Sequence, residues 1–241
     1  MGKTQSFKEY VLISLQITPT IARVIRSVIF DLDGTLIHSL PGLAASLNRV
    51  LKMTQLPTHP EQVVRTFIGN GIHKLVERAV PAGYATEDIP ELVSAMSADY
   101  AATWKEGTTR YPGTAETLSI LADQQIRTAV FSNKPDVFCR QITDHLFPDT
   151  SFSIVLGQRQ GTPTKPDPEG AHVTARALGD KPQEIAFVGD STIDLSTARN
   201  AAMIPVAATW GYHDLAALES ENPRHIIHRI EDLIPIINTS L

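Results

Sequence analysis

Two aspartates, Asp31 and Asp33, directly follow the apolar run "VIF". A third acid, Asp190, follows the apolar run "IAFV", and Lys165 stands in the stretch "TPTKPDP". If the three acids lie together, they repel one another strongly unless a cation is present. Hard oxygen ligands of this kind suit Mg²⁺. Carboxylates, a divalent cation and a lysine are the groups that phosphoryl transfer needs, because that reaction depends on positioning and charge neutralisation.

The elements that must position these residues are short apolar runs that predict buried strands. The runs lie at residues 27–30, 127–131, 152–156, 184–188 and 204–208, with a weaker candidate at 224–230. Their apolar character is continuous rather than alternating, as in parallel strands covered on both faces. Helical spacing separates several of them, at residues 113–125, 168–179 and 192–203. This alternation predicts a doubly wound, Rossmann-like α/β core with a parallel sheet.

The polar residues stand where these strands end. In an open α/β sheet, ligands bind beyond the carboxyl ends of the strands. If the runs are neighbouring parallel strands, Asp31, Ser132 and Asp190 meet in one cleft, and Lys165 can join them. Each strand end alone is more simply explained as a turn or a helix cap, since Asp and Ser are common there. The joint pattern favours a functional site.

Residues 40–110 interrupt the alternation of strands and helices. This segment carries helical patterns and no strand pattern, and Gly and Pro residues mark its entry and exit. We therefore expect residues 25–39 and 111–241 to form the α/β core, with 40–110 as an inserted helical domain. Residues 1–24 contain a short apolar run without a small-residue cleavage site, which predicts an N-terminal extension rather than a signal peptide.

The composition is that of an ordinary globular protein. The chain has 241 residues, of which 42% are hydrophobic and 20% charged, with a net charge of −5. A mildly acidic chain predicts no nucleic-acid partner and no membrane partner. The single cysteine, Cys139, is expected to be a small buried hydrophobe, and it fits a reducing cytoplasm. We expect a cytoplasmic monomer or homodimer that acts on a small molecule.

Four short motifs, "DLDGT", "SNK", "KPDP" and "GDSTID", resemble those of the haloacid dehalogenase superfamily of aspartyl-phosphate hydrolases. They occur in the family's order, and the resemblance extends from about Ile25 to the end of the chain. The helical insert after the first motif resembles the family's C1-type cap domain. The resemblance implies that Asp31 is the nucleophile that attacks phosphorus. It also implies that Asp33 protonates the leaving alcohol and then activates water.

The resemblance implies further roles for the residues at the strand ends. Ser132 and Lys165 would bind the transferring phosphoryl oxygens and offset their charge. Mg²⁺ would be held by Asp31, the backbone carbonyl of Asp33, and Asp190. Supporting positions would belong to Thr35, Asn133 and Asp194.

The substrate is expected to be a small phosphate monoester. The stretch "TFIGNGIHKLVERAV" resembles the cap loop of phosphoglycolate phosphatases, as do "FSNKP", "RYPGT" and "WGYH", so 2-phosphoglycolate is the first choice. The glycines at the tip of that loop and two basic residues near it are candidate substrate contacts: Gly69, Gly71, Arg65 and His73. The solvated face of a helix is the alternative for each basic residue. Lys134 belongs to the "SNK" motif, but it could equally be a surface charge.

Three other functions remain open from the sequence. A sugar-phosphate mutase of the beta-phosphoglucomutase type and a pyrophosphatase both use the same scaffold. The third is a receiver-like signalling domain, which accepts phosphate on a clustered aspartate and is not an enzyme. The helical insert and the position of Asp33 argue against the receiver. Asp33 also disfavours a dehalogenase, because a halide leaving group needs no proton.

Overall fold

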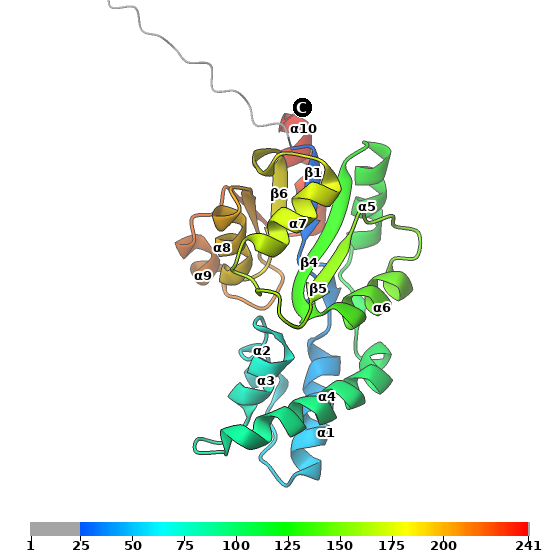
Figure 1. Cartoon of the computed structure of the whole chain (residues 1–241). Helices are drawn as coiled ribbons and strands as arrows, with labels where there is room; N and C mark the ends of the chain where they lie inside the picture. Colours follow the sequence, from blue (N-terminus) through cyan, green and yellow to red (C-terminus); the bar gives the residue numbers. More distant parts are fainter. Residues whose placement is uncertain (1–24, 241) are drawn as a thin grey trace, which may run out of the picture.

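The computed structural model describes residues 25–240, and a six-stranded parallel sheet forms its centre (Figure 1). The expected N-terminal extension, residues 1–24, lies outside the described residues. The strand order is β5-β4-β1-β6-β7-β8. The strands are β1 (Ser27–Phe30), β4 (Arg127–Pro135), β5 (Val155–Gln158), β6 (Ile185–Gly189), β7 (Ile204–Ala208) and β8 (His225–Ile227).

Helices cover both faces of this sheet, so the predicted doubly wound fold is confirmed. Along β1, Val28 and Phe30 pack on one side, while Ile29 packs on the other. The first side is covered by α5 (Thr114–Asp123), α6 (Asp136–Leu146) and α10 (Leu233–Ser240). The second side is covered by α7 (Glu169–Leu178), α8 (Thr192–Asn200) and α9 (Leu215–Ser220). Every strand of the sheet is therefore shielded on both faces, which explains the continuous apolar runs.

Four α-helices follow one another between two short strands, β2 (Ile37–His38) and β3 (Thr109–Arg110). They are α1 (Leu40–Met53), α2 (Glu61–Arg65), α3 (Gly71–Ala79) and α4 (Ile89–Thr103), and they make up most of residues 40–110, which we call the helical insert. Two single 3₁₀ turns, Thr86–Asp88 and Trp104–Glu106, flank α4. A third 3₁₀ turn, Pro182–Glu184, precedes β6, and a fourth, Ile230–Asp232, precedes α10. In Figure 1 the insert lies below the sheet, next to the ends of β1 and β4.

β2 and β3 form a two-stranded antiparallel ribbon that joins the insert to the rest of the chain. Ile37 faces Arg110, and His38 faces Thr109. The sequence prediction of no strand within residues 40–110 is wrong for β3. Two residues are too few to show the alternation by which a strand is recognised in a sequence.

Two strands have the predicted boundaries and others differ: β5 begins and ends later than the predicted 152–156, and β6 is shifted by one residue from 184–188. β1 and β7 have the predicted bounds. β4 was expected to end at residue 131 but continues to Pro135, with an irregular register against β5 after Phe131. Ser132, Asn133 and Lys134 therefore lie within a strand and not after it. Of the helices between residues 25 and 240, none has the length and hydropathy of a membrane span.

Candidate active site

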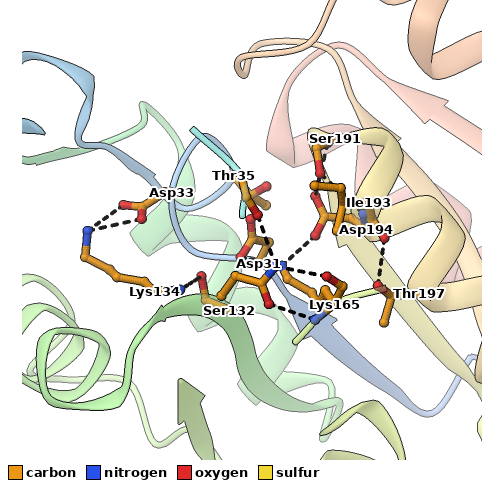
Figure 2. Close-up of polar contacts among 12 residues, drawn as sticks. Asp31, Asp33, Thr35, Ser132, Lys134, Lys165, Ser191, Ile193, Asp194 and Thr197 are labelled. Carbon is orange, nitrogen blue, oxygen red and sulfur yellow. Dashed lines mark hydrogen bonds and ion pairs between the residues drawn. The ribbon is translucent and has the colours of Figure 1, made fainter. Parts of the chain in front are cut away.

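Residues from two strand ends and one loop line a single cavity beside the insert, and Figure 2 shows the polar contacts among them. Asp31 follows β1, Ser132 lies in the extended end of β4, and Lys165 comes from the loop between β5 and α7. The Lys165 Nζ atom lies 2.8 Å from Asp31 Oδ1 and 2.6 Å from Asp194 Oδ1. The cavity is small, about 50 Å³. Asp31, Ser132 and Lys165 thus line one cavity as predicted, whereas Asp190 is not among the lining residues and lies close to the site through the carboxylate of Asp31.

Three buried carboxylates, those of Asp31, Asp190 and Asp194, offer oxygen atoms that all lie within 4.8 Å of one another. Burial raises the pKa of Asp31 to about 6, although Lys165 opposes the shift. Burial also raises the pKa of Asp190 well above its usual range, and the charges of Asp194 and Asp31 add to the effect. One lysine does not neutralise three acids, and a set of hard oxygen donors fits a small divalent cation.

Asp190 is held in place by two donors and by closely packed backbone. Thr35 Oγ1 donates to its Oδ1 at 2.9 Å, and the backbone N–H of Tyr212 donates to its Oδ2 at 2.7 Å. Gly34 has a φ of +87°, and a Cβ atom there would clash with the carboxylate of Asp190. The glycine of "DLDGT" is therefore required both by its backbone conformation and by the neighbouring carboxylate.

Asp194 lies behind Lys165 and also caps α8. Ser191 Oγ donates to Asp194 Oδ2 at 2.6 Å, and the Ser191 N–H donates to the same oxygen at 3.1 Å. The other oxygen, Oδ1, accepts from Lys165. Burial alone would lower the pKa of Lys165, but the charges of Asp194 and Asp31 raise it above the usual value. Lys165 therefore stays charged, and Asp194 serves as a helix cap and as its counter-ion at once.

Asp33 faces a different lysine. Lys134 Nζ lies 3.0 Å from Asp33 Oδ1 and 3.1 Å from Oδ2, and Ser39 Oγ donates to Oδ1 at 2.5 Å. The same ammonium donates to Tyr100 Oη of α4 at 3.0 Å. The Lys134 side chain is only 4% exposed. Its interpretation as a surface charge is therefore wrong, and its place right after Ser132 and Asn133 was the signal for a buried site residue.

Asn133 joins the two sides of the cavity. Its Oδ1 accepts from the Lys165 N–H at 2.8 Å, while its Nδ2 donates to the Lys165 carbonyl at 3.2 Å. The same Nδ2 donates to the carbonyl of Gly69 in the insert at 3.0 Å. Asn133 thus fixes the lysine loop and the turn before α3 with one amide.

The four candidate substrate contacts divide into two pairs. Gly69 and Gly71 line the cavity. Arg65 instead donates to the carbonyls of Tyr212 and Gly211, at 2.6 and 3.3 Å. His73 is exposed on α3, where its Nδ1 lies 3.9 Å from a carboxylate oxygen of Glu77. The structure gives Arg65 and His73 no place in the lining of this cavity.

Tyr212 is a residue of the site that sequence reasoning did not identify. Its hydroxyl accepts from the backbone N–H groups of Ser39 and Leu40, each at 3.1 Å, where the chain enters α1. Its own N–H binds Asp190, and its carbonyl accepts from Arg65 of α2. The motif "WGYH" contains Tyr212, but nothing in its spacing indicates contacts to three separate segments.

Comparison with known proteins gives consistent matches over most of the chain. A family model for haloacid dehalogenase-like hydrolase matches residues 28–208. A phosphoglycolate phosphatase of Pectobacterium atrosepticum is 37% identical over 219 residues, which cover 90% of this chain and 94% of that protein. The phosphoglycolate phosphatase of Escherichia coli (strain K12) is 34% identical, with coverage of 88% and 92%.

The solved structures agree with the sequence matches. The crystal structure of a predicted phosphoglycolate phosphatase from Haemophilus somnus 129pt superimposes with a TM-score of 0.78 at 32% sequence identity. The match covers 88% of this chain and 97% of that one. A predicted phosphatase from Clostridium acetobutylicum, at 21% identity and a TM-score of 0.79, shares the fold.

Proposed function

The chain belongs to the haloacid dehalogenase-like hydrolases, and from this membership we propose that it is a Mg²⁺-dependent phosphatase of 2-phosphoglycolate. The observation that carries the proposal is the cavity in which Asp31, Asp33, Ser132 and Lys165 meet. Two further facts support the substrate. The relatives at 34–37% identity are phosphoglycolate phosphatases, and the small cavity suits a small ester.

In the proposed reaction Asp31 forms a bond to phosphorus while the bond from phosphorus to the ester oxygen breaks. Asp33 gives its proton to the departing alkoxide, so glycolate leaves with a neutral hydroxyl group. Asp33 then accepts a proton from water as the water oxygen attacks the aspartyl-phosphate. Inorganic phosphate departs and the Asp31 carboxylate is restored.

The other residues of the cavity hold the phosphoryl group in place. Ser132 Oγ and the Lys165 ammonium bind its oxygens, and Lys165 offsets their charge. Asp31, the carbonyl of Asp33, and Asp190 would hold Mg²⁺, which supplies charge neutralisation for the incoming phosphate. Asp194 keeps Lys165 charged and oriented, and Thr35 orients Asp190. Asn133 fixes the loop that carries Lys165.

The helical insert has a part in this function as well. We propose that residues 40–110 act as a cap domain over a core made of 25–39 and 111–241. Gly69, Ile72 and Tyr100 of the insert line the same cavity as Asp31. A cap of this kind excludes water from the phosphoryl group and selects the ester.

A panel of phosphate esters with purified protein and Mg²⁺ tests the proposed activity. Phosphate release from 2-phosphoglycolate well above that from pyrophosphate is expected. Isomerised sugar phosphate without net phosphate release would instead favour the mutase. Phosphorylated protein that persists for hours without turnover would favour the receiver-like function.

Removal of the nucleophile tests the covalent mechanism. We expect Asp31→Asn to lower kcat by at least a thousandfold while the circular dichroism spectrum stays unchanged. Asp123→Asn is the matched control, because Asp123 is an exposed acid at the end of α5. Comparable turnover in Asp31→Asn and in the control would end the aspartyl-phosphate mechanism.

A further inference from the structure

Two buried ammonium groups face the cavity from different sides (Figure 2). Among the described residues that line it, only Lys134 and Lys165 carry a positive charge. Lys165 is held from the sheet side, by Asp31 and by Asp194 of α8. Lys134 is held from the side of the insert, where Tyr100 of α4 accepts from its Nζ at 3.0 Å. Lys165 is thus the cation that binds the phosphoryl group, and Lys134 is a second cation on the side of the cavity that faces the insert.

The second cation lies beside the group that meets the leaving oxygen. In the proposed reaction Asp33 passes its proton to the ester oxygen, and both oxygens of Asp33 lie within 3.1 Å of Lys134 Nζ. The part of the substrate bonded to that oxygen therefore lies next to Lys134. In 2-phosphoglycolate this part is a single CH₂ group that carries a carboxylate.

The insert offers little else that could bind a carboxylate. Its side chains in the cavity lining are apolar except for the hydroxyl of Tyr100: Leu43, Ile68, Ile72 and Leu75. Arg65 and His73, the basic residues first considered for this role, do not line the cavity. A buried ammonium is costly unless paired, and among the described residues Asp33 is the one carboxylate that pairs with Lys134. When Asp33 carries the proton that it gives to the leaving oxygen, that carboxyl group is neutral, so Lys134 then needs another anionic partner.

Building on the proposed function, we propose that Lys134 is the specificity-determining residue that binds the carboxylate of the substrate. Tyr100 holds the Lys134 ammonium toward the insert, with its ring 4.6 Å from Nζ. The substrate class is then a short phosphorylated hydroxy acid whose carboxylate is next to the ester carbon. Esters of the same size with a neutral end leave Lys134 without this partner and are rejected.

The test compares two substrates that differ only at that end. They are 2-phosphoglycolate and 2-hydroxyethyl phosphate, in which a CH₂OH group replaces the carboxylate. We expect Lys134→Met to lower the ratio of their kcat/KM values at least tenfold, mainly because the variant binds 2-phosphoglycolate more weakly and its KM rises. A purely structural role for Lys134 would lower both values together and leave the ratio unchanged.

Two further variants sharpen the comparison. Lys52→Met removes an exposed lysine of the insert and should keep the wild-type ratio. Tyr100→Phe keeps the ring but removes the hydroxyl that accepts from Lys134, so the ratio should fall by a few fold. An unchanged ratio in Lys134→Met would overturn the proposal.

A binding measurement covers the case in which Lys134→Met turns over neither ester. In the Asp31→Asn background, calorimetry should show 2-phosphoglycolate binding at least tenfold more tightly than 2-hydroxyethyl phosphate. Adding Lys134→Met should abolish that preference, and its persistence would overturn the proposal. A wild-type enzyme that does not hydrolyse 2-phosphoglycolate would instead contradict the proposed function itself.

Discussion

Gly34 shows how little room surrounds the proposed metal ligands. A methyl group at this position would require both an unfavourable backbone conformation, since φ is +87°, and the displacement of Asp190. We expect Gly34→Ala to lower the free energy of unfolding by about 2–4 kcal/mol, from the left-handed backbone and the steric clash together. Mg²⁺ affinity should fall as well. Urea unfolding and Mg²⁺ titration measure the two effects.

Gly83→Ala separates the two causes. Gly83 has a φ of +85°, but a Cβ atom there would meet nothing within 4 Å. The free energy of unfolding of this variant should therefore fall by only about 1–2 kcal/mol, which is the cost of the left-handed backbone. The variant should retain wild-type activity. Equal losses in the two variants would show that Asp190 moves aside freely.

Cys139 provides a prediction about reactivity. The thiol is fully buried in α6, and burial raises its pKa well above the usual value. Because the thiolate is the reactive form, the folded protein should react with iodoacetamide at pH 8 at least a hundredfold more slowly than the urea-unfolded protein. Mass spectrometry of the alkylated chain measures both rates. Fast labelling of the native protein would mean that α6 opens readily.

At the residue level, the sequence predicted the positions of the acids but not their partners. Asp31 and Asp190 were identified because strand ends of one sheet must meet. The place of Lys134 right after Ser132 and Asn133 indicated a site residue, but its partner Tyr100 lies far away in the chain and could not be predicted. Tyr212 was missed because its role depends wholly on contacts of this kind, such as that with Ser39. Short-range patterns contain no information about such contacts.

Among the elements, the loop after β7 ties the start of α1 to the sheet. The Tyr212 hydroxyl accepts from two backbone N–H groups there. We expect Tyr212→Phe to lower the free energy of unfolding by about 1–3 kcal/mol, because it leaves buried donors without an acceptor. Urea unfolding measures the loss.

A matched tyrosine serves as the control for Tyr212→Phe. Tyr84 packs against the core, and its hydroxyl makes no hydrogen bond to the part of the chain that the structure describes. Tyr84→Phe should therefore change stability by less than about 0.5 kcal/mol. If both variants behave alike, the hydroxyl of Tyr212 contributes nothing at the entrance to α1.

The extended β4 marks the limit of strand prediction from the sequence. Its first five residues are apolar enough to be recognised, whereas Ser132, Asn133 and Lys134 look like a loop. They remain in the strand because the Asn133 amide, the Lys134 ion pair and the cavity give these polar groups buried partners. Tertiary contacts therefore override the local preference here.

For the whole molecule, the three clustered carboxylates make stability depend on both pH and metal. Folding raises the pKa of Asp31 to about 6, and that of Asp190 also rises well above its usual range. The folded state then binds protons more tightly than the unfolded state. The metal-free protein should therefore lose stability as pH rises from about 4 through 6. Thermal unfolding in EDTA at several pH values measures this trend.

Bound Mg²⁺ should reverse that loss. A ligand that binds only the folded state raises the free energy of unfolding by about 2.7 kcal/mol when its concentration is one hundred times its Kd. The rise in Tm on adding Mg²⁺ should be largest at pH 7 and small at pH 4.5. Asp190→Asn should be more stable than the wild type in EDTA at pH 7 and insensitive to Mg²⁺. A metal-free Tm that increases across this pH range would contradict the argument.

The overall architecture was the most predictable part of the molecule. Apolar runs and their spacing were sufficient for the sheet, because burial on both faces leaves a strong pattern. The placement of the insert over the cavity was not predictable residue by residue. It rests on side-chain contacts such as that of Arg65 with Tyr212, which join segments far apart in the chain.

The paired strands β2 and β3 have an evolutionary consequence. Since Ile37 faces Arg110 and His38 faces Thr109, the chain leaves and rejoins the sheet layer at adjacent points. Close ends let a different segment be inserted there while the order of strands in the sheet stays the same. Selection can therefore exchange one lid for another and redirect the same phosphoryl chemistry to new esters.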